Sequence, residues 1–582
     1  MDRRQPSVRL RLIGAYAVSQ SLVLALLLGP LAGQPWWQGF RGYFFNDQLS
    51  YAAIASNVSV GDMRLVEPFT LTGTLYYPSL WYQTMGLLAR ATGLPVYLMW
   101  TLMGVVAVCI AVGVVGWAGY RFSGRAYAPL IPALALLTGT ISTPTSGNWY
   151  SPLGSHAVVW GPFGSLFTLN AEIAGLCLAA IAMSLVLLAT RSPRNRPALV
   201  VSAAALIGLL ANIQTYSFFT TILLVTLFAA VWSLMQVRSP VLTAITVILL
   251  LAVLLGGSYV AKATGPLPMF VLLLLALVPA IIPAVRRHRG LFLSAAGVLA
   301  IAAAPQVVRT AVGLAGGDAF LTYRQASSQD LGVPVANAIF GAIPLILIGA
   351  VCAIAAWRRR ESAIAAVLIA LATGAAIMST NDRWGFDQEP YRFWLQYEIL
   401  AALMLSITFS WAIAQWPTFG IRRKMAFASV GVAAAMVWAV SLADVAGFWI
   451  YARGEGVISA QDDRAVAVRE VLRTHDGLVM SSDCLDPRVL KMISPGAVAY
   501  YNYGLAWPAA EPAFRIFKDA ERRASEDPAA LQAAGVDYVL TDSACTSDWD
   551  FTREPRVRPE RTQNYDSSTG PQTLTLWRVA PA

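Results

Sequence analysis

The sequence predicts a polytopic α-helical membrane protein, with about 13 transmembrane helices and a small C-terminal extracytoplasmic α/β domain. Of its 582 residues, 57% are hydrophobic and only 13% are charged, and the mean hydropathy is +0.58. Soluble globular proteins do not show this balance. Apolar runs of about 20 residues, the length that crosses a bilayer core of about 30 Å, recur through the first three quarters of the chain. Basic clusters occupy alternate loops between these runs.

The apolar runs define the expected spans. They begin near Leu12, Val96, Ala126, Leu166, Ala198, Phe218, Val241, Met269, Leu291, Val335, Ala363, Phe393 and Met425. The first run, Leu12 to Leu31, is longer than a signal-peptide core and lacks a small-residue cleavage site. We therefore expect it to remain as the first span. A polar break from Asn212 to Tyr216 separates two short runs, and this feature favours a transporter.

The basic residues predict the orientation of the chain. The formal net charge of +10 comes from short clusters in alternate loops, which is typical of cytoplasmic loops and does not indicate a nucleic-acid partner. The clusters are Arg3, Arg4, Arg9 and Arg11; Arg121 and Arg125; Arg191, Arg194 and Arg196; Arg238; Arg286, Arg287 and Arg289; Arg358 to Arg360; and Arg422 to Lys424. We expect a multi-pass protein of the inner (plasma) membrane with a cytoplasmic N-terminus. An odd number of spans then places the C-terminal domain outside the cytoplasm.

One segment decides this orientation. Tyr76 to Leu94 contains several aromatic residues and Arg90, and we expect it to form a helix lying at the outer surface. Counting it as a span would place every later basic cluster outside, against the positive-inside rule.

The chain is expected to divide near residue 450. Residues 1–450 would form the transmembrane domain, with long outer loops at 34–95, 142–165, 311–332 and 380–391. Residues 451–582 are enough for an extracytoplasmic domain with its own core. The pattern predicts helices at Ala460 to Thr474, Glu511 to Arg523 and Pro528 to Ala534, and strands at Gly477 to Ser481, Val536 to Thr541 and Thr573 to Arg578.

The five cysteines fall into two groups. Cys109, Cys177 and Cys352 lie in apolar runs and are expected to pack as small core residues. Cys484 and Cys545 lie in the polar C-terminal part. An oxidising compartment would allow them to form one disulfide, but their spacing alone does not decide this.

The 34–95 loop contains an acidic residue beside aromatic residues, in the stretch from Phe44 to Tyr51. Partial desolvation at the membrane surface would make Asp47 a better proton acceptor, as the attack of a sugar hydroxyl requires. The alternative is that Asp47 caps a helix from Gln48 to Val58, because Asp favours that position. The two roles can coexist.

An acid just after the first span, a long first outer loop with an amphipathic helix, the stretch Tyr77 to Trp81 and an extracytoplasmic C-terminal domain together resemble the GT-C superfamily of membrane glycosyltransferases. Asn46-Asp47-Gln48, the stretch Tyr76 to Trp81 and the short Gly317 to Phe320 segment are most similar to actinobacterial arabinofuranosyltransferases of the cell wall. The resemblance implies a GT-C-like fold, a polyprenyl-phosphate sugar donor, a glycan acceptor and Asp47 as general base. It also implies substrate contacts for Gln48, Tyr77 and Trp81. Several relatives have a paired acid where this chain has one, so we assign no metal ligand and no certain cofactor, and leave a divalent cation open.

The 380–391 loop and the arginine that follows it form the second candidate cluster. Arg383 or Arg392 would hold a donor phosphate by bidentate hydrogen bonds. Acids and rings of the same cluster would orient substrate; these are Asp382, Trp384, Asp387, Glu389 and Tyr391. The alternative is a self-satisfied loop of acid and arginine pairs anchored by interfacial aromatic rings.

Other outer residues complete the candidate site. Tyr323 and Arg324 would contact the donor and its phosphate, unless they belong to an ordinary solvated loop. His156 is a candidate substrate contact or a hydrogen-bonded structural residue. Glu172 and Glu398 fall near the outer ends of spans, where acids are costly, so each is expected to pair with an arginine or to line a wet cavity. We include Glu172 among the substrate contacts.

These observations favour a glycosyltransferase that moves a sugar, with arabinofuranose as one candidate, to a cell-envelope glycan on the outer face of the membrane. The sequence has no glycine-rich phosphate loop with lysine, no zinc-spaced histidines or cysteines and no Gly-x-Ser-x-Gly elbow. A donor already activated on a lipid phosphate fits that pattern. The alternatives are a secondary transporter and a non-catalytic envelope-assembly protein.

Overall fold

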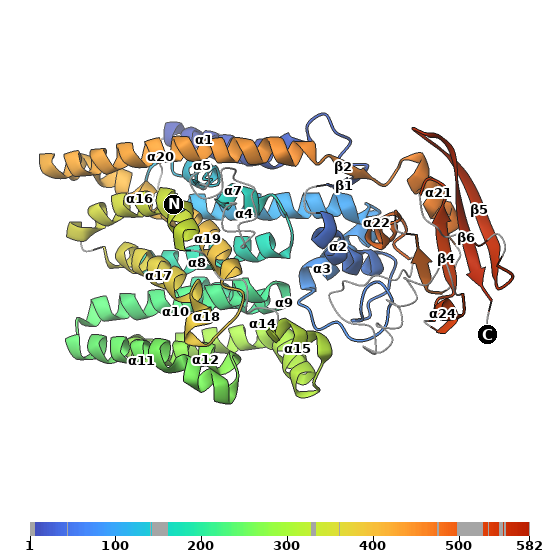
Figure 1. The fold of residues 1–582 in the computed structure, drawn as a ribbon. Coiled ribbons are helices and arrows are strands. Elements are labelled where there is room, and N and C mark those ends of the chain that lie inside the picture. The colour runs from blue at the N-terminus through green and yellow to red at the C-terminus, as the bar shows by residue number, and fades with distance from the viewer. Residues whose placement is uncertain are drawn as a thin grey trace. The chain divides into compact units, whose positions relative to one another are not determined.

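The structure, a computed structural model, describes residues 6–42, 45–139, 141, 161–326, 333, 335–359, 361–473, 477–482, 484–496, 528–533, 535–545, 551 and 554–580. Among these residues, ten helices are long and apolar enough to cross a membrane. They are α1 (Pro6–Leu28), α4 (Val96–Ser123), α8 (Ala171–Arg191), α9 (Arg196–Ile213), α10 (Thr215–Val237), α11 (Pro240–Thr264), α14 (Arg289–Ala315), α16 (Val335–Arg359), α19 (Pro390–Gln415) and α20 (Ile421–Gly454). The predicted polytopic helical fold is confirmed (Figure 1).

The remaining expected spans are shorter. Helices α12 (Leu267–Ala276) and α13 (Val278–Arg287) meet at a bend of 59°, where a proline lies in the first turn of α13, and together they form an eleventh candidate span. Helix α17 (Ser362–Met378) has 17 residues. The run near Ala126 gives only α5 (Leu130–Ala135) within the described residues. The described chain therefore supplies ten or eleven full spans, compared with the expected number of about 13.

The chain divides into two compact units. The helical unit contains residues 1–30, 104–308 and 324–453. The mixed unit contains residues 31–103, 309–323 and 454–582, and so groups the 34–95 loop with the C-terminal residues. The expected boundary near residue 450 stays a prediction.

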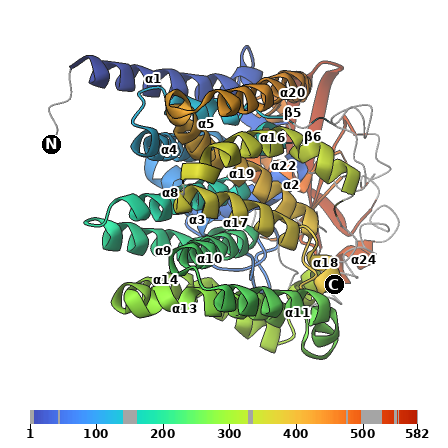
Figure 2. The same ribbon diagram turned by 90° about the vertical axis from the view of Figure 1, so that its left-hand side faces the viewer.

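The helical unit has inner and outer helices. Most residues in the apolar stretches of α8 and α19 are buried, whereas few residues in those of α1, α11, α14 and α20 are. Both views place α8 and α19 between α1 and α20 on one side and α11 on the other (Figures 1 and 2). Many large apolar side chains of the outer helices are exposed, as with Leu255 and Ile301, each 77% exposed. Such surfaces are stable against lipid, because helices satisfy their own backbone groups there.

The polar break at Asn212 is part of the packing of this unit. The side chain of Asn212 donates to the carbonyl of Ala302 at 2.8 Å and accepts from the backbone N–H of Gln306 at 3.1 Å. These two groups flank Pro305, which interrupts the hydrogen bonding of α14. Asn212 therefore provides hydrogen-bond partners for backbone groups of α14 in the turn that contains Pro305.

The mixed unit begins with two helices and a short pair of strands. Helix α2 (Phe45–Ser59) packs on α3 (Leu80–Thr92), whose 13 residues are too few to span a bilayer, as expected for the Tyr76 to Leu94 segment. Strand β1 (Gly39–Arg41) pairs antiparallel with β2 (Val457–Ser459). A Cβ atom at Gly39 would lie 2.1 Å from the carbonyl oxygen of Ile458, so this close pairing needs glycine.

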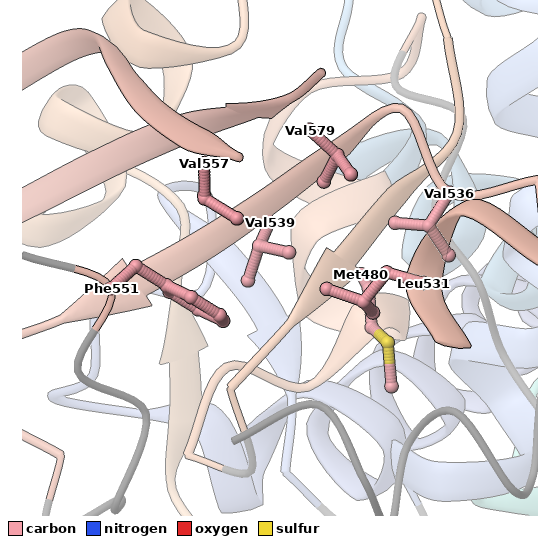
Figure 3. Packing of buried hydrophobic residues seen from close by; sticks show 7 residues of the cluster. All are labelled: Met480, Leu531, Val536, Val539, Phe551, Val557 and Val579. Atoms are coloured by element: carbon pink, nitrogen blue, oxygen red, sulfur yellow. The ribbon is translucent and has the colours of Figure 1, made fainter. Parts of the chain in front are cut away.

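The C-terminal part contains a four-stranded sheet in the order β3-β4-β6-β5. Its strands are β3 (Val479–Ser481), β4 (Tyr538–Asp542), β5 (Val557–Ser567) and β6 (Gly570–Val579). β3 and β4 are parallel, and β4, β6 and β5 are antiparallel neighbours. Figure 3 shows the core on this sheet, formed by Met480, Leu531, Val536, Val539, Phe551, Val557 and Val579.

Several C-terminal predictions are confirmed within a few residues. The expected first helix is α21 (Asp463–Val471), and the expected Pro528 helix is α24 (Pro528–Ala533). The three predicted strands correspond to β3, β4 and β6. The Glu511 to Arg523 helix lies outside the described residues. The sequence did not predict β5 or the helix α22 (Pro487–Ile493).

A disulfide joins the two cysteines of the C-terminal part. Cys484 and Cys545 are bonded, with their Cα atoms 5.7 Å apart and their positions separated by 61 in sequence. The described free cysteines are Cys109, Cys177 and Cys352. Such a bond is typical of chains that fold in an oxidising compartment.

We predict that replacing Cys484 and Cys545 together by serine lowers the free energy of unfolding of this sheet by about 4 kcal/mol, because the disulfide closes a long loop in the unfolded chain. Hydrogen exchange of β3 and β4 amides measures the change. Alkylation of both cysteines in the unreduced protein would contradict the bond itself.

Candidate functional site

Asn381 fixes the backbone of the 380–391 loop. The loop begins with α18 (Asn381–Trp384), and Asn381 is fully buried. Its side chain donates to the carbonyl of Gln388 at 2.8 Å and accepts from the backbone N–H of the same residue at 2.9 Å. Its carbonyl accepts from the N–H of Asp387 at 3.1 Å. One buried amide therefore closes the loop on itself.

Aromatic residues anchor the same loop in the helical unit. The buried indole of Trp384 donates to the carbonyl of Ile377 at 2.8 Å and stacks on Phe386 at 5.8 Å. Phe386 in turn packs against the rings of Phe219 and Phe270. Trp384, predicted to contact substrate, is thus engaged within the protein, and its substrate contact stays a prediction.

Arg392 lies between two buried carboxylates. It forms ion pairs with Glu389 on the residue preceding α19 and with Glu172 in the first turn of α8, the latter with 3.9 Å between Nη1 and Oε2. The guanidinium also lies near the ring faces of Tyr391 and Tyr216, at 5.4 and 5.5 Å from the ring centroids. These contacts resemble the self-satisfied alternative from the sequence.

Hydrogen bonds extend this cluster across three helices. Tyr216 of α10 donates to Glu389 at 2.5 Å. Ser217 donates to Gln396 at 2.8 Å, and Gln396 donates to Glu172 at 3.0 Å. Polar groups at membrane depth need such partners, because water is not there to replace them. A donor phosphate at Arg392 would compete with two carboxylates, and phosphate binding there stays a prediction.

Arg383 and Asp382 stand apart from this network. Both are exposed, and among the described residues neither side chain forms an ion pair. They lie at a cavity of about 720 Å³ whose walls come from α16, α17, α18 and α19. Most of the lining is apolar, and nine of its 24 residues are alanine or glycine, with Ala338, Ala342, Gly349, Ala372 and Ala375 as examples. The cavity thus combines an apolar lining with a guanidinium that has no ion-pair partner among the described residues.

Asp47 lies in the first turn of α2 and is exposed. The helix begins at Phe45, two residues before Asp47, so the alternative that Asp47 caps a helix starting at Gln48 is wrong. An acidic residue in the first turn is still favoured by the helix dipole. Gln48 is buried, and its substrate contact, like the base role of Asp47, stays a prediction.

A series of stacked rings supports α2 in the mixed unit. Tyr51 stacks on Tyr77 at 5.3 Å and on Tyr82 at 5.4 Å, and Tyr82 stacks on Trp100 at 5.6 Å. The indole N–H of Trp81 is buried, and no described group accepts from it. Tyr77 therefore has a packing role in addition to its predicted substrate contact.

Three predicted site residues have no described side chain. His156 lies outside the described residues. The backbones of Tyr323 and Arg324 lie in α15 (Ala319–Ala326). Their predicted contacts with donor and phosphate stay predictions.

A buried acid and a buried lysine connect the 34–95 loop with the C-terminal part of the mixed unit. Glu67 and Lys491 are each 1% exposed. Glu67 accepts from the backbone N–H groups of Phe69 and Thr70 at 3.1 and 2.6 Å. Burial raises the pKa of Glu67 to about 7 and lowers the pKa of Lys491 to about 8, and their opposite charges partly offset both shifts.

One described group of side chains has the spacing of metal ligands. The ligand atoms of Cys484, Asp542 and Cys545 lie within 4.8 Å of one another. The two cysteines are bonded to each other, and Asp542 pairs with Arg464 at 2.8 Å and accepts from Tyr565 at 2.9 Å. These partners occupy the group, and the question of a divalent cation stays open.

Sequence reasoning missed the partners that lie far away along the chain. No sequence pattern pointed to Tyr216, Ser217 and Gln396, because their hydrogen bonds form only where three helices meet. Lys491 could have been found, since a single lysine within the apolar run Val489 to Ile493 predicts a buried counter-charge.

The chain has the fold of the GT-C membrane glycosyltransferases. The likeness rests on arabinofuranosyltransferase AftD from mycobacteria, one variant of which superposes with a TM-score of 0.50 at 14% identity. The match covers 99% of this chain and 42% of that one. At this identity the comparison shows the fold and not the reaction.

Two other solved structures are similar at lower scores. ArnT from Cupriavidus metallidurans, bound to undecaprenyl phosphate, has a TM-score of 0.48 at 12% identity, with 97% of both chains covered. Oligosaccharyltransferase AglB from Archaeoglobus fulgidus, in complex with an inhibitory peptide and a dolichol-phosphate, has a TM-score of 0.47 at 14% identity, covering 98% of this chain and 74% of that one. No family model matches the sequence. No curated protein matches it either.

We predict that Arg392→Met destabilises the protein by about 3 to 5 kcal/mol, because it leaves two buried carboxylates without a counter-charge. Adding Glu172→Gln and Glu389→Gln should restore much of the loss. The midpoint of thermal unfolding in detergent measures both effects. Arg383→Met is the matched control and should change stability little, because Arg383 is exposed. Equal effects at the two arginines would contradict the assignment.

We predict that the stability of the mixed unit is lowest between about pH 7 and pH 8. The raised pKa of Glu67 gives stability that is present below about pH 4.5 and is lost as the pH rises through about 7. The lowered pKa of Lys491 restores stability as the pH rises from about 8 toward 10.5. Thermal unfolding across this range tests the curve. Glu67→Gln should flatten its acidic side and Lys491→Met its basic side, and each substitution should extend the remaining slope, because the partner's charge no longer offsets the remaining pKa shift.

Proposed function

We propose that this protein is a GT-C glycosyltransferase that moves a sugar from a polyprenyl-phosphate donor to a cell-envelope glycan. The observation that carries the proposal is the cavity between α16, α17 and α19, with Arg383 at its edge. A polyprenyl phosphate is a long apolar chain that ends in an anion. Small apolar side chains suit the chain, and an unpaired guanidinium suits the phosphate. The similar GT-C fold supports this reading.

The proposed reaction is a single displacement with inversion at the anomeric carbon. The Asp47 carboxylate takes the proton of an acceptor hydroxyl, and the hydroxyl oxygen attacks the anomeric carbon. The bond from that carbon to the phosphate oxygen breaks, and the polyprenyl phosphate leaves with the electron pair. Arg383 stabilises the charge that develops on the phosphate. The energy comes from the donor bond itself.

Arabinofuranose is the sugar we propose to test first. The Asn46-Asp47-Gln48 and Tyr76 to Trp81 stretches resemble arabinofuranosyltransferases, and the structure with a TM-score of 0.50 is one. We also propose that the reaction occurs on the outer face of the plasma membrane. The alternating basic loops and the Cys484–Cys545 disulfide support a cytoplasmic N-terminus and an extracytoplasmic C-terminal domain.

We predict that Asp47→Asn lowers transfer by about 100-fold or more, because the acceptor loses its general base. The assay follows labelled arabinose from undecaprenyl-phosphate arabinofuranose into cell-wall glycan. The variant should fold normally, since Asp47 is exposed. The matched control is Asp463→Asn, which removes another exposed first-turn acid of the mixed unit and should leave transfer unchanged.

If the Asp47→Asn variant transferred sugar as fast as wild type, Asp47 would not be the general base. Absence of transfer by the unaltered chain from any polyprenyl-phosphate sugar, together with normal envelope assembly in cells that carry Asp47→Asn, would favour a non-catalytic assembly protein.

A further inference from the structure

The cavity beside Arg383 contains polar groups that an isoprenoid chain cannot satisfy. Glu398 and Tyr397 of α19 line it at 3% and 2% exposure, and Ser379 at the end of α17 lines it at 9%. Among the described residues, neither carboxyl oxygen of Glu398 has a hydrogen-bond partner, nor does the hydroxyl of Tyr397 or of Ser379. Around Arg392, by contrast, hydrogen bonds join Tyr216 to Glu389 and Gln396 to Glu172.

Trp394 belongs to the same set. It lies one helical turn before Glu398, so the two side chains are on the same face of α19. Its indole N–H is near enough to the Glu398 carboxyl group to interact with it, but no hydrogen bond of normal geometry joins them. An aromatic ring beside a carboxyl group and hydroxyl groups is a common combination for binding a sugar, since the ring covers an apolar sugar face and the polar atoms meet hydroxyls.

The unpaired groups of Glu398, Tyr397 and Ser379 are energetically unfavourable as long as the cavity offers them no hydrogen-bond partner. A buried polar group without a hydrogen-bond partner destabilises the folded protein, and a buried carboxyl group does so more strongly than a hydroxyl group. Native structures keep few such groups, and each calls for an explanation such as a bound ligand. Several of them around one cavity therefore indicate an occupant with hydrogen-bonding groups at that depth.

We propose that Glu398, Tyr397, Ser379 and Trp394 form the subsite for the sugar of the lipid-linked donor. This inference rests on the proposed function and deepens it. The Glu398 carboxyl group accepts from sugar hydroxyls, the Tyr397 and Ser379 hydroxyls each exchange one hydrogen bond with the sugar, and Trp394 covers the ring. The phosphate meets Arg383, and the isoprenoid chain lies along the small residues of α16 and α17. The few polar groups suit a pentofuranosyl group better than a hexose with more hydroxyls.

The test compares two lipids that differ only in the sugar. The full chain in detergent is titrated with undecaprenyl phosphate and, separately, with undecaprenyl-phosphate arabinofuranose, and the dissociation constants are measured for wild type, Tyr397→Phe, Ser379→Ala and Glu398→Gln. We expect each substitution to weaken binding of the sugar-bearing lipid by about 10-fold while leaving the bare lipid unchanged, because one lost hydrogen bond is worth about 1 to 1.5 kcal/mol. Leu405→Ala, in the apolar lining, is the matched control and should weaken both lipids equally.

The outcomes separate the inference from the proposed function. Equal weakening of both lipids by Tyr397→Phe and Ser379→Ala, or no weakening of either, overturns the sugar subsite and leaves the lipid-phosphate donor standing. Failure of wild type to bind either lipid overturns the proposed function and the subsite with it. The thermal unfolding midpoint of each variant is measured alongside. If Tyr397→Phe or Glu398→Gln does not fold, the binding constants of Ser379→Ala, the smallest change, test the sugar subsite.

Discussion

Charge compensation around Arg392 is the interaction on which the arrangement of the helical unit depends. A guanidinium and two carboxylates lie among helices, where an uncompensated charge would be very costly. Each therefore restricts the others, and through Tyr216 and Gln396 the cluster joins α8, α10 and the start of α19. The 380–391 loop enters α19 directly at this cluster, so its position is determined at one end by the ion pairs and at the other by Asn381 and Trp384.

A loop fixed in this way can present side chains that the fold itself does not use. Asp382 and Arg383 lie on its exposed turn, beside a cavity that exists because α16 and α17 contribute small residues where they face α19. The two arginines of this region differ in their partners and therefore in their roles. Arg392 has partners and stabilises structure, whereas Arg383 has none among the described residues and is available to an anionic ligand. The same contrast separates Glu172, which is paired, from Glu398, which is not.

Hydropathy predicted most of the long helices. An apolar run that lies in lipid must pair its own backbone N–H and C=O groups, and an α-helix does this. The proline bend between α12 and α13 and the strand β5 were harder to predict. β5 is an edge strand with mostly exposed residues, so its sequence has the composition of a loop, and only pairing with β6 reveals it. In the candidate site, the sequence located the acids and arginines of the 380–391 loop and expected Glu172 and Glu398 to pair or to line a cavity. The sequence could not decide that Glu172 pairs with Arg392 and that Glu398 lines the cavity, because both arrangements depend on helices that meet only in the folded chain.

Photocrosslinking can test whether the cavity beside Arg383 binds a polyprenyl phosphate. A polyprenyl phosphate with a diazirine in its chain is irradiated with the full chain in nanodiscs, and the labelled peptides are identified by mass spectrometry. We expect labels on cavity residues of α16 and α17, such as Ala342 and Ala375, which excess undecaprenyl phosphate suppresses and Arg383→Gln reduces. Labels confined to the lipid-exposed helices α11, α14 and α20, and insensitive to competitor, would contradict binding in this cavity.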